Sequence, residues 1–229
     1  MDRYSIAYGS WIIKRRWLII MLSLFLTILA VAGARNLVFN GDYRIFFSED
    51  NPRLKAFAVL ERTYTKTDNI LLVVKANDNN IFNPETLDII KQMTEEAWLM
   101  PFSSRVDSGT NYQHTLAEDD DLTVRDLVPN PKSLTAEDVA YIRDIAVNDP
   151  LIAKRLVAED GATVGIFVTL QIPEGTNSPE EPVMAYSRAM VAKYMALDPN
   201  LTIVLTGITA LNNAFVETSL HDMQFLTPL

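Results

Sequence analysis

Residues 162–172 read ATVGIFVTLQI, and this stretch decides the fold. Every second residue from Val164 to Ile172 is aliphatic, whereas the residues between them are mixed. Successive side chains of a strand point to opposite faces, so this alternation predicts a β-strand with one buried face. The runs 69–76 (NILLVVKA) and 201–206 (LTIVLT) are also rich in β-branched residues and predict two further strands. A weaker, polar strand is predicted within 103–115.

Helix signals separate these strands. A capping side chain followed by proline predicts helix starts at Asn51-Pro52 and at Asn83-Pro84. Thr135 can cap a third helix, and Ser178-Pro179-Glu180-Glu181 is typical of a capping box that opens a fourth. The first, third and fourth helices are predicted to end at about Tyr64, Asn148 and Leu197, and the second is predicted to carry Ala97-Trp98 on its inner face. After Gly207 the apolar pattern is helical again, with a predicted stripe of Leu211, Phe215, Val216, Leu220 and Met223.

The order of these elements is β-α-β, an insertion at about 116–158 with its own helix, and then β-α-β. This order predicts an α+β domain of the split βαβ, or ferredoxin-like, arrangement. Its antiparallel sheet would carry helices on one face and leave the other face for a partner. Within the insertion, Glu118 to Asp121 is an acidic run without the ligand spacing of a calcium loop, so we expect a solvated loop there.

Residues 17–34 form an uncharged apolar block, interrupted by Ser23 and Thr27. An α-helix rises about 1.5 Å per residue, so this block covers roughly 27 Å, close to the hydrocarbon thickness of a bilayer. Both hydroxyls can hydrogen-bond to carbonyls of their own helix. We therefore predict a transmembrane helix at 17–34.

The charges around this block predict its direction. Residues 1–16 carry four basic side chains and one acidic one, whereas the rest of the chain carries 16 basic and 28 acidic side chains, a formal charge of −12. Basic residues beside a first span hold that end in the cytoplasm, so residues after Ala34 are expected on the other side. An acidic exported domain is a poor nucleic-acid partner, because the phosphates repel it.

A cleaved signal peptide is the alternative interpretation of the N-terminus. Lys14-Arg15-Arg16 fits a basic leader, and Ala32-Gly33-Ala34 fits the small residues of a cleavage site. The apolar block is longer than the usual leader, however, and sixteen residues precede it. These features favour a retained anchor.

The sequence gives no catalytic, cofactor or metal signature. Cysteine is absent, and the two histidines, His114 and His221, are far apart, so no zinc motif is recognisable. Gly9-Ser10 lies on the cytoplasmic side, and Asp107-Ser108-Gly109 lacks the flanking motif of a hydrolase nucleophile. We therefore predict that the chain is not an enzyme. No substrate-contacting residue can be named from the pattern.

An ordered set of short motifs runs along the chain. Its members are the basic stretch and apolar block 14–34, 42–52 (DYRIFFSEDNP) followed by Leu54, Phe57, Leu60 and Glu61, then 68–70, 81–87 (IFNPETL), 126–128, 148–151, Asp160-Gly161, Gly207, Asp222 and Pro228. This set resembles the first periplasmic loop of the resistance-nodulation-division (RND) superfamily. It is most similar to the bacterial MMPL-type predicted exporters of lipids and other hydrophobic molecules, and the resemblance covers essentially the whole chain.

The resemblance implies a division into four parts in the bacterial inner membrane. These are a cytoplasmic segment 1–16, a first transmembrane helix 17–34, a periplasmic porter domain 35–222 and the start of a second transmembrane helix at 223–229. It implies proton-driven export of a hydrophobic or lipid-like substrate, with the rest of the transporter and a second porter half as partners. The alternative is a single-pass, membrane-anchored periplasmic protein that binds a ligand or a partner.

The chain departs from the pattern of a proton-driven exporter in one respect. Proton coupling in such transporters uses acidic residues inside membrane spans, and residues 17–34 contain none. We therefore expect that this chain, expressed alone, transports nothing, although its exported domain folds.

Overall fold

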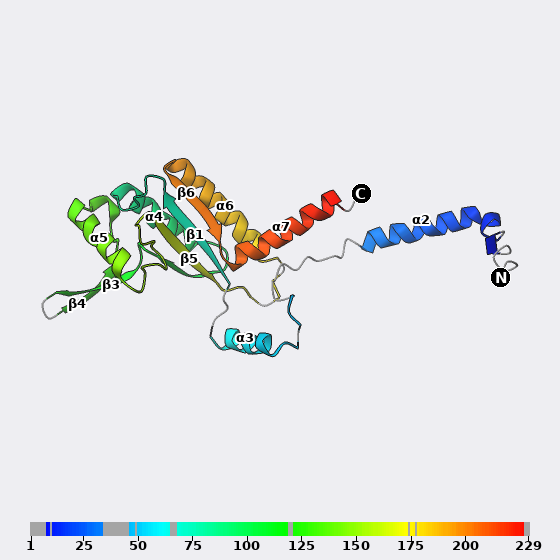
Figure 1. Ribbon diagram of the computed structural model, residues 1–229, viewed down its shortest axis with the longest axis horizontal. Helices are drawn as coiled ribbons and strands as arrows, with labels where there is room; N and C mark the ends of the chain where they lie inside the picture. The colour runs from blue at the N-terminus through cyan, green and yellow to red at the C-terminus, as the bar shows by residue number, and fades with distance from the viewer. Residues whose placement is uncertain are drawn as a thin grey trace. The chain divides into compact units, whose positions relative to one another are not determined.

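The computed structural model describes residues 8–9, 11–33, 46–48, 50–64, 68–118, 121–173, 175–176 and 178–226. It divides into two units, Met1–Asn40 and Gly41–Leu229. The first contains helix α2 (Arg16–Gly33) and the second is a mixed α+β domain (Figure 1). Several sequence predictions lie outside the described residues: Ala34, motif residues 42–45 and Glu49, Asp119-Asp120 of the acidic run, and 227–229 with Pro228.

Helix α2 forms where the apolar block predicted it. None of its residues is buried within the chain, and Thr27 Oγ1 donates to the carbonyl of Ser23 at 3.0 Å, as expected for a hydroxyl in an apolar helix. Among the described helices it alone is long and apolar enough to cross a membrane. A signal sequence near an N-terminus has the same length and composition, so the helix itself leaves anchor and leader open.

The four predicted strands lie in one antiparallel sheet, in the order β2-β5-β1-β6. Their bounds are β1 Asn69–Ala76, β2 Ser103–Ser108, β5 Thr163–Leu170 and β6 Leu201–Thr206. Strands β1 and β5 form the centre and pair from Asn69↔Thr169 to Lys75↔Thr163. Figure 1 shows the long central strands with β6 beside β1.

The alternation of β1 and β5 builds the core. The even-numbered residues of both strands are buried, from Ile70 to Ala76 and from Val164 to Leu170. Helices α4 (Pro84–Ala97) and α6 (Glu180–Leu197) supply the facing layer, which includes Leu87, Ile90, Met93, Val183, Met190 and Tyr194. Trp98, predicted on the inner face of α4, instead follows the helix and is 48% exposed. The odd-numbered positions of β1 and β5 stay partly or fully accessible.

Three of the four predicted helix starts are confirmed. Asn51 caps α3 (Pro52–Thr63), and Asn83 caps α4 by accepting from the Thr86 amide at 2.8 Å. Thr135 and Asp138 form a reciprocal capping box at the start of α5 (Ala136–Asn148).

The capping box predicted for α6 is wrong. The N-cap of α6 is Pro179, without a side-chain cap, and Ser178 has φ +47°. A capping side chain reaches the first amides of a helix from an extended backbone, which Ser178 does not have. Its carbonyl instead accepts from the amide of Glu181 at 3.3 Å.

The predicted strand within 103–115 is also corrected, because β2 ends at Ser108. A turn follows, and β3 (Gln113–Glu118) pairs with β4 (Asp121–Asp126) in a separate hairpin. Gly109 packs so closely in this turn that a Cβ would lie 3.0 Å from Val157 and 3.2 Å from Val164. The insertion therefore holds a hairpin and the short 3₁₀ helix η3 (Pro131–Ser133) as well as α5. The two ends of the acidic run, Glu118 and Asp121, are strand residues.

Helix α7 (Ile208–Leu226) confirms the predicted helix but not its buried face. Thr209, Asn212 and Asn213 are its buried residues, while Leu211, Phe215, Leu220 and Met223 of the predicted stripe are exposed. Arg188 of α6 donates two hydrogen bonds, of 2.7 and 2.9 Å, to the Glu217 carboxylate. These bonds, with a further contribution from the Asn213 side-chain amide, lower the pKa of Glu217 to about 2. Since 227–229 are not described, the second membrane span stays a prediction.

Gly207 sets the turn from β6 into α7, and we predict that its replacement destabilises the domain. Its φ is +109°, and a Cβ would lie 2.7 Å from Asn69 Oδ1 and 2.9 Å from the Asn69 carbonyl. Gly207→Ala is expected to lower the free energy of unfolding by roughly 2–4 kcal/mol, from backbone strain plus the clash. The control Gly175→Ala has φ +79° with nothing within 4 Å, so it should cost about 1 kcal/mol. Equal losses in urea unfolding would contradict this account.

Candidate functional site

The base of the β3–β4 hairpin is the candidate functional site of the described domain. Gln113 pairs with Asp126 and His114 pairs with Arg125, so four polar side chains meet where the hairpin leaves the domain. The Gln113 amide donates to the Asp126 carboxylate across the pair. Asp126 lines two cavities, and the hairpin base is therefore a wall shared by both.

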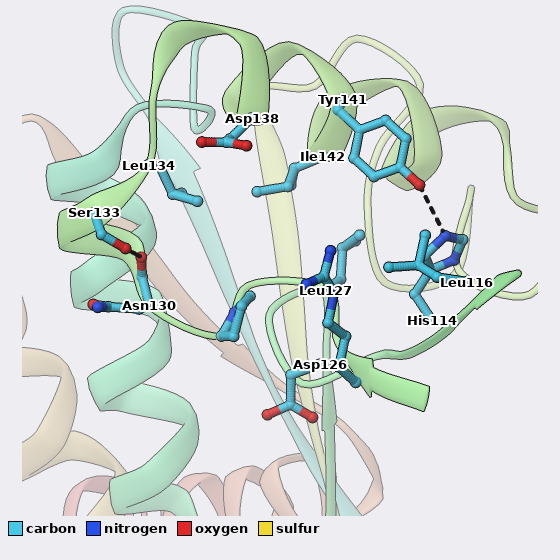
Figure 2. A pocket seen from close by; sticks show the side chains of 12 residues that line it. His114, Leu116, Asp126, Leu127, Asn130, Ser133, Leu134, Asp138, Tyr141 and Ile142 are labelled. Atoms are coloured by element: carbon cyan, nitrogen blue, oxygen red, sulfur yellow. Dashed lines mark hydrogen bonds between the residues drawn. The ribbon is translucent and has the colours of Figure 1, made fainter. Parts of the chain in front are cut away.

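The first cavity lies between the hairpin and α5, with a volume of about 210 Å³ (Figure 2). Directly opposed residues of an antiparallel pair project to the same face, so His114 and Arg125 line it together. His114 Nε2 lies 3.2 Å from the hydroxyl of Tyr141 on α5, in an edge-on ring contact. The other lining residues are Leu116, Asp126, Leu127, Pro129, Asn130, Ser133, Leu134, Asp138 and Ile142.

The two carboxylates of this cavity are engaged within the protein. Asp138 Oδ2 accepts from the Thr135 amide at 2.8 Å and from its hydroxyl at 2.7 Å, and these hydrogen bonds lower the pKa of Asp138. Asp126 accepts from Gln113. Within the described part of the chain, the Arg125 guanidinium makes no hydrogen bond or salt bridge, but its charge also helps to lower the pKa of Asp138. The cavity thus offers a guanidinium, an imidazole and a phenol above aliphatic side chains, which suits a small polar group.

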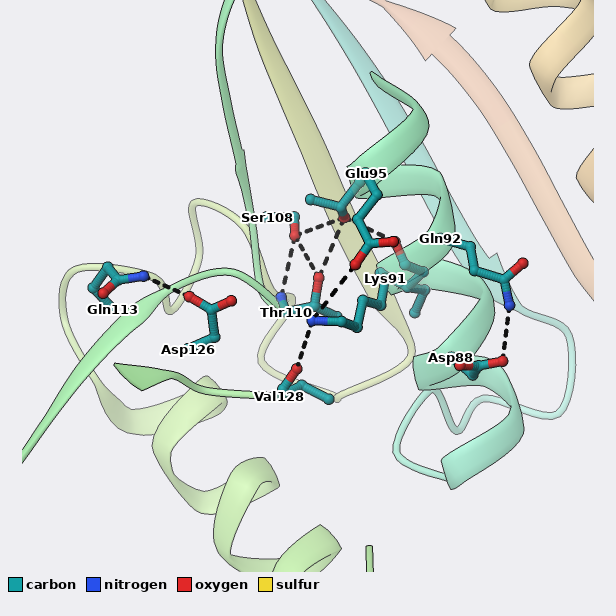
Figure 3. Close-up of polar contacts among 11 residues, drawn as sticks. Asp88, Lys91, Gln92, Glu95, Ser108, Thr110, Gln113, Asp126 and Val128 are labelled. Carbon is teal, nitrogen blue, oxygen red and sulfur yellow. Dashed lines mark hydrogen bonds and ion pairs between the residues drawn. The ribbon is translucent and has the colours of Figure 1, made fainter. Parts of the chain in front are cut away.

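The second cavity, of about 250 Å³, lies on the α4 side of the hairpin base. Lys91 spans it, with Nζ 3.4 Å from the Val128 carbonyl and 3.7 Å from the Glu95 carboxylate (Figure 3). Thr94, Trp98, Thr110, Asn111, Gln113 and Asp126 complete its lining. The partly exposed Trp98 gives this polar cavity one aromatic wall.

A buried hydroxyl cluster lies beneath the second cavity. Thr94 Oγ1 donates to the Ile90 carbonyl at 2.8 Å, and it lies 2.9 Å from Ser108 Oγ and 3.2 Å from Thr110 Oγ1. Ser108 and Thr110 are 2.8 Å apart. No histidine or carboxylate is hydrogen-bonded to the three hydroxyls in the part of the chain that the structure describes. The cluster therefore joins α4 to the end of β2.

Among the described residues, no hydrogen bond joins Ser133 to His114 in the first cavity. Ser133 Oγ donates to the Asn130 carbonyl at 3.1 Å, and His114 is bonded to Tyr141. Across the described residues, no three or more His, Asp or Glu side chains are close enough to hold a metal ion.

The sequence pattern assigned no binding role to any residue of this site, although Asp126 belongs to the motif 126–128. His114 was considered only as a zinc ligand, and Ser108 only as a nucleophile; the structure places Ser108 in the hydroxyl cluster and His114 on the wall of the first cavity. One signal was present. Threonine and leucine occur on both sides of the acidic run, within 113–118 and 121–126, and valine follows it. This pattern is compatible with a hairpin.

Two comparisons with known proteins found no relative of this chain. No protein-family model matches this chain, and no curated protein matches it. The resemblance to the RND superfamily thus rests on the ordered motifs of the sequence.

We predict that the hydroxyl cluster stabilises the junction of α4 and β2. Thr94→Val keeps the shape of the side chain but leaves Ser108 and Thr110 with one partner fewer, so it should cost about 1–3 kcal/mol of unfolding free energy. Thr123→Val, the same change at an exposed hairpin position, should stay within about 0.5 kcal/mol of the parent. Urea unfolding of the two variants measures the difference, and a silent Thr94→Val would disprove the structural role.

Proposed function

We propose that this chain anchors a porter domain on the periplasmic side of a bacterial inner membrane. It would form the N-terminal part of an RND-type, MMPL-like exporter of lipids or other hydrophobic molecules. One observation carries the proposal: a membrane-length apolar helix with a basic N-terminal flank precedes an α+β domain with two interlocked βαβ units. The ordered motifs of the sequence are the reason for proposing this family.

The strand order supports a ferredoxin-like assignment. The unit β1-α4-β2 has β5 between its two strands, and the unit β5-α6-β6 has β1 between its two strands. The strands of each βαβ unit are thus separated by a strand of the other unit, and this order supports the split βαβ arrangement. The hairpin, η3 and α5 are then an insertion between the two units.

The sheet face opposite the helices fits the handling of an apolar substrate. Leu71 and Val73 of β1, Phe167 of β5 and Val204 of β6 are partly or fully accessible there. Threonines lie among these apolar side chains, so the face is only partly apolar. In the proposed exporter, the second porter half would face the same pathway, and later spans would carry the proton-exchanging acids.

The second candidate is a single-pass, membrane-anchored binding protein. The two cavities at the hairpin base favour it, because they lie outside the sheet and hold polar groups instead of an apolar path. A binding protein would need these cavities and no further spans. An exporter would fail without the later spans whatever the cavities bind.

The proposed topology predicts opposite labelling of two introduced cysteines, and the absence of native cysteine makes the reaction specific. In intact cells, Thr123→Cys should react with a membrane-impermeant maleimide, while Gly9→Cys should react only after permeabilisation. Mass spectrometry of the membrane-bound protein should find residues 1–34 attached. A mature N-terminus at Arg35 would establish the signal peptide instead.

Residues 1–229 alone are expected to support no gradient-dependent efflux. Their apolar block has no ionisable side chain to exchange protons across the membrane, and one porter domain has no second half to rock against. Retention of a hydrophobic fluorescent dye, with and without a protonophore, compares cells carrying these residues with cells carrying the whole gene. Protonophore-sensitive efflux from residues 1–229 alone would refute the proposal, as would its absence with the whole gene.

A further inference from the structure

The two edges of the sheet are finished differently. Strands β2 and β6 are the outer strands, and each has one row of backbone N–H and C=O groups that no neighbouring strand pairs with among the described residues. Such a row pairs readily with another strand unless the protein blocks it.

The edge at β2 is blocked by three features. The Asn111 side chain donates from Nδ2 to the Val106 carbonyl at 2.8 Å, and its Oδ1 accepts from the Ser108 amide at 2.7 Å. One side-chain amide thus takes the place of a neighbouring strand. The register also shifts between Ser103 and Arg105, and Arg105 forms an ion pair with Asp107 within the strand. Bulges and charges both discourage edge pairing.

The edge at β6 has none of these features among the described residues. The Asn77 amide donates to the Asn200 carbonyl at 2.8 Å, and the sides alternate along an antiparallel strand. The backbone groups of Thr202, Val204 and Thr206 therefore face β1, and those of Ile203 and Leu205 face outward. The strand LTIVLT contains no charge and no proline, and its register with β1 is continuous.

We propose that this open β6 edge pairs antiparallel with the β6 edge of a second copy of the chain. The sequence of β6 is self-complementary when Val204 lies opposite its own copy. Ile203 then lies opposite Leu205, and Thr202 lies opposite Thr206. Opposed residues share a face, so the aliphatic pair continues the core side and the threonine pair continues the open side.

Charge sets the conditions for this pairing. The six residues of β6 are neutral, but the whole chain carries a formal charge of −9, so two copies repel at long range. Added salt screens that repulsion and leaves the backbone hydrogen bonds of the edge intact. Self-association should therefore strengthen with ionic strength. The pairing does not rest on the proposed export, because its hydrogen bonds use the backbone of β6, although the Val204 side chain also lies on the open sheet face.

Single cysteines in the full chain, held in detergent, test the pairing and its register. Val204 would form a non-hydrogen-bonded pair with its copy, with Cα atoms about 4.5 Å apart, within disulfide range. Under a mild oxidant, Val204→Cys should give a covalent dimer. A mixture of Thr202→Cys and Thr206→Cys chains should cross-link more than either alone. The control Val124→Cys is 57% exposed on the hairpin, against 54% for Val204, and should remain monomeric on a denaturing gel.

Charged residues introduced at Val204 test the same contact without a covalent cross-link. Val204→Lys and Val204→Glu should each weaken self-association by roughly fivefold in sedimentation velocity, because each places like charges opposite one another. An equimolar mixture of the Val204→Lys and Val204→Glu variants should restore self-association, because opposite charges then face each other. A variant that had lost its fold would not be restored by mixing. A parent chain that stays monomeric at high salt overturns the proposal. So does equal cross-linking at positions 204 and 124, or a β6 edge occupied by a different protein while this chain remains single.

Discussion

Strands β1 and β5 pair along seven residues, from Asn69↔Thr169 to Lys75↔Thr163, and both also pair with an edge strand. Their backbone groups are therefore satisfied on both sides, and their even-numbered side chains are withdrawn from water on one face. Since each central strand begins a different βαβ unit, neither unit can complete its sheet without the other. Helices α4 and α6 must then lie on the same face, over the residues that the pairing aligns.

The pairing also decides what is left uncovered. One face carries the helices, so the odd-numbered residues of the central strands stay accessible, and the sheet ends in two edges. At one edge the turn after β2 folds Asn111 back onto the strand, and the chain leaves in a hairpin. At the other edge β6 passes through Gly207 into α7 without such a cap among the described residues. Both candidate interaction regions, the hairpin base and the β6 edge, follow from how these edges are finished.

The proposed exporter role and these local sites rest on different kinds of observation. The membrane-length helix and the ordered motifs concern the whole chain, whereas the cavities depend on side chains from β3, β4, α4 and α5. A polar cavity beside Arg125 and His114 is compatible with a porter domain and with a binding protein. The apolar path expected of lipid transport corresponds better to the open sheet face around Phe167 and Val204.

The sequence by itself determined the elements whose pattern is local. Alternation located β5, and runs rich in β-branched residues located β1 and β6. Asparagine and threonine caps located α3, α4 and α5, and an uncharged block located α2. Strand pleat, β-propensity, helix caps and membrane thickness are all read from neighbouring residues. Tertiary structure alone decided the rest. The turn that ends β2 depends on Gly109 packing against Val157 and Val164, and the hydroxyl cluster joins Thr94 to Ser108. The apolar stripe of α7 is exposed because the domain buries Thr209 and Asn212 instead. These contacts join residues distant in the chain, and no local period encodes them.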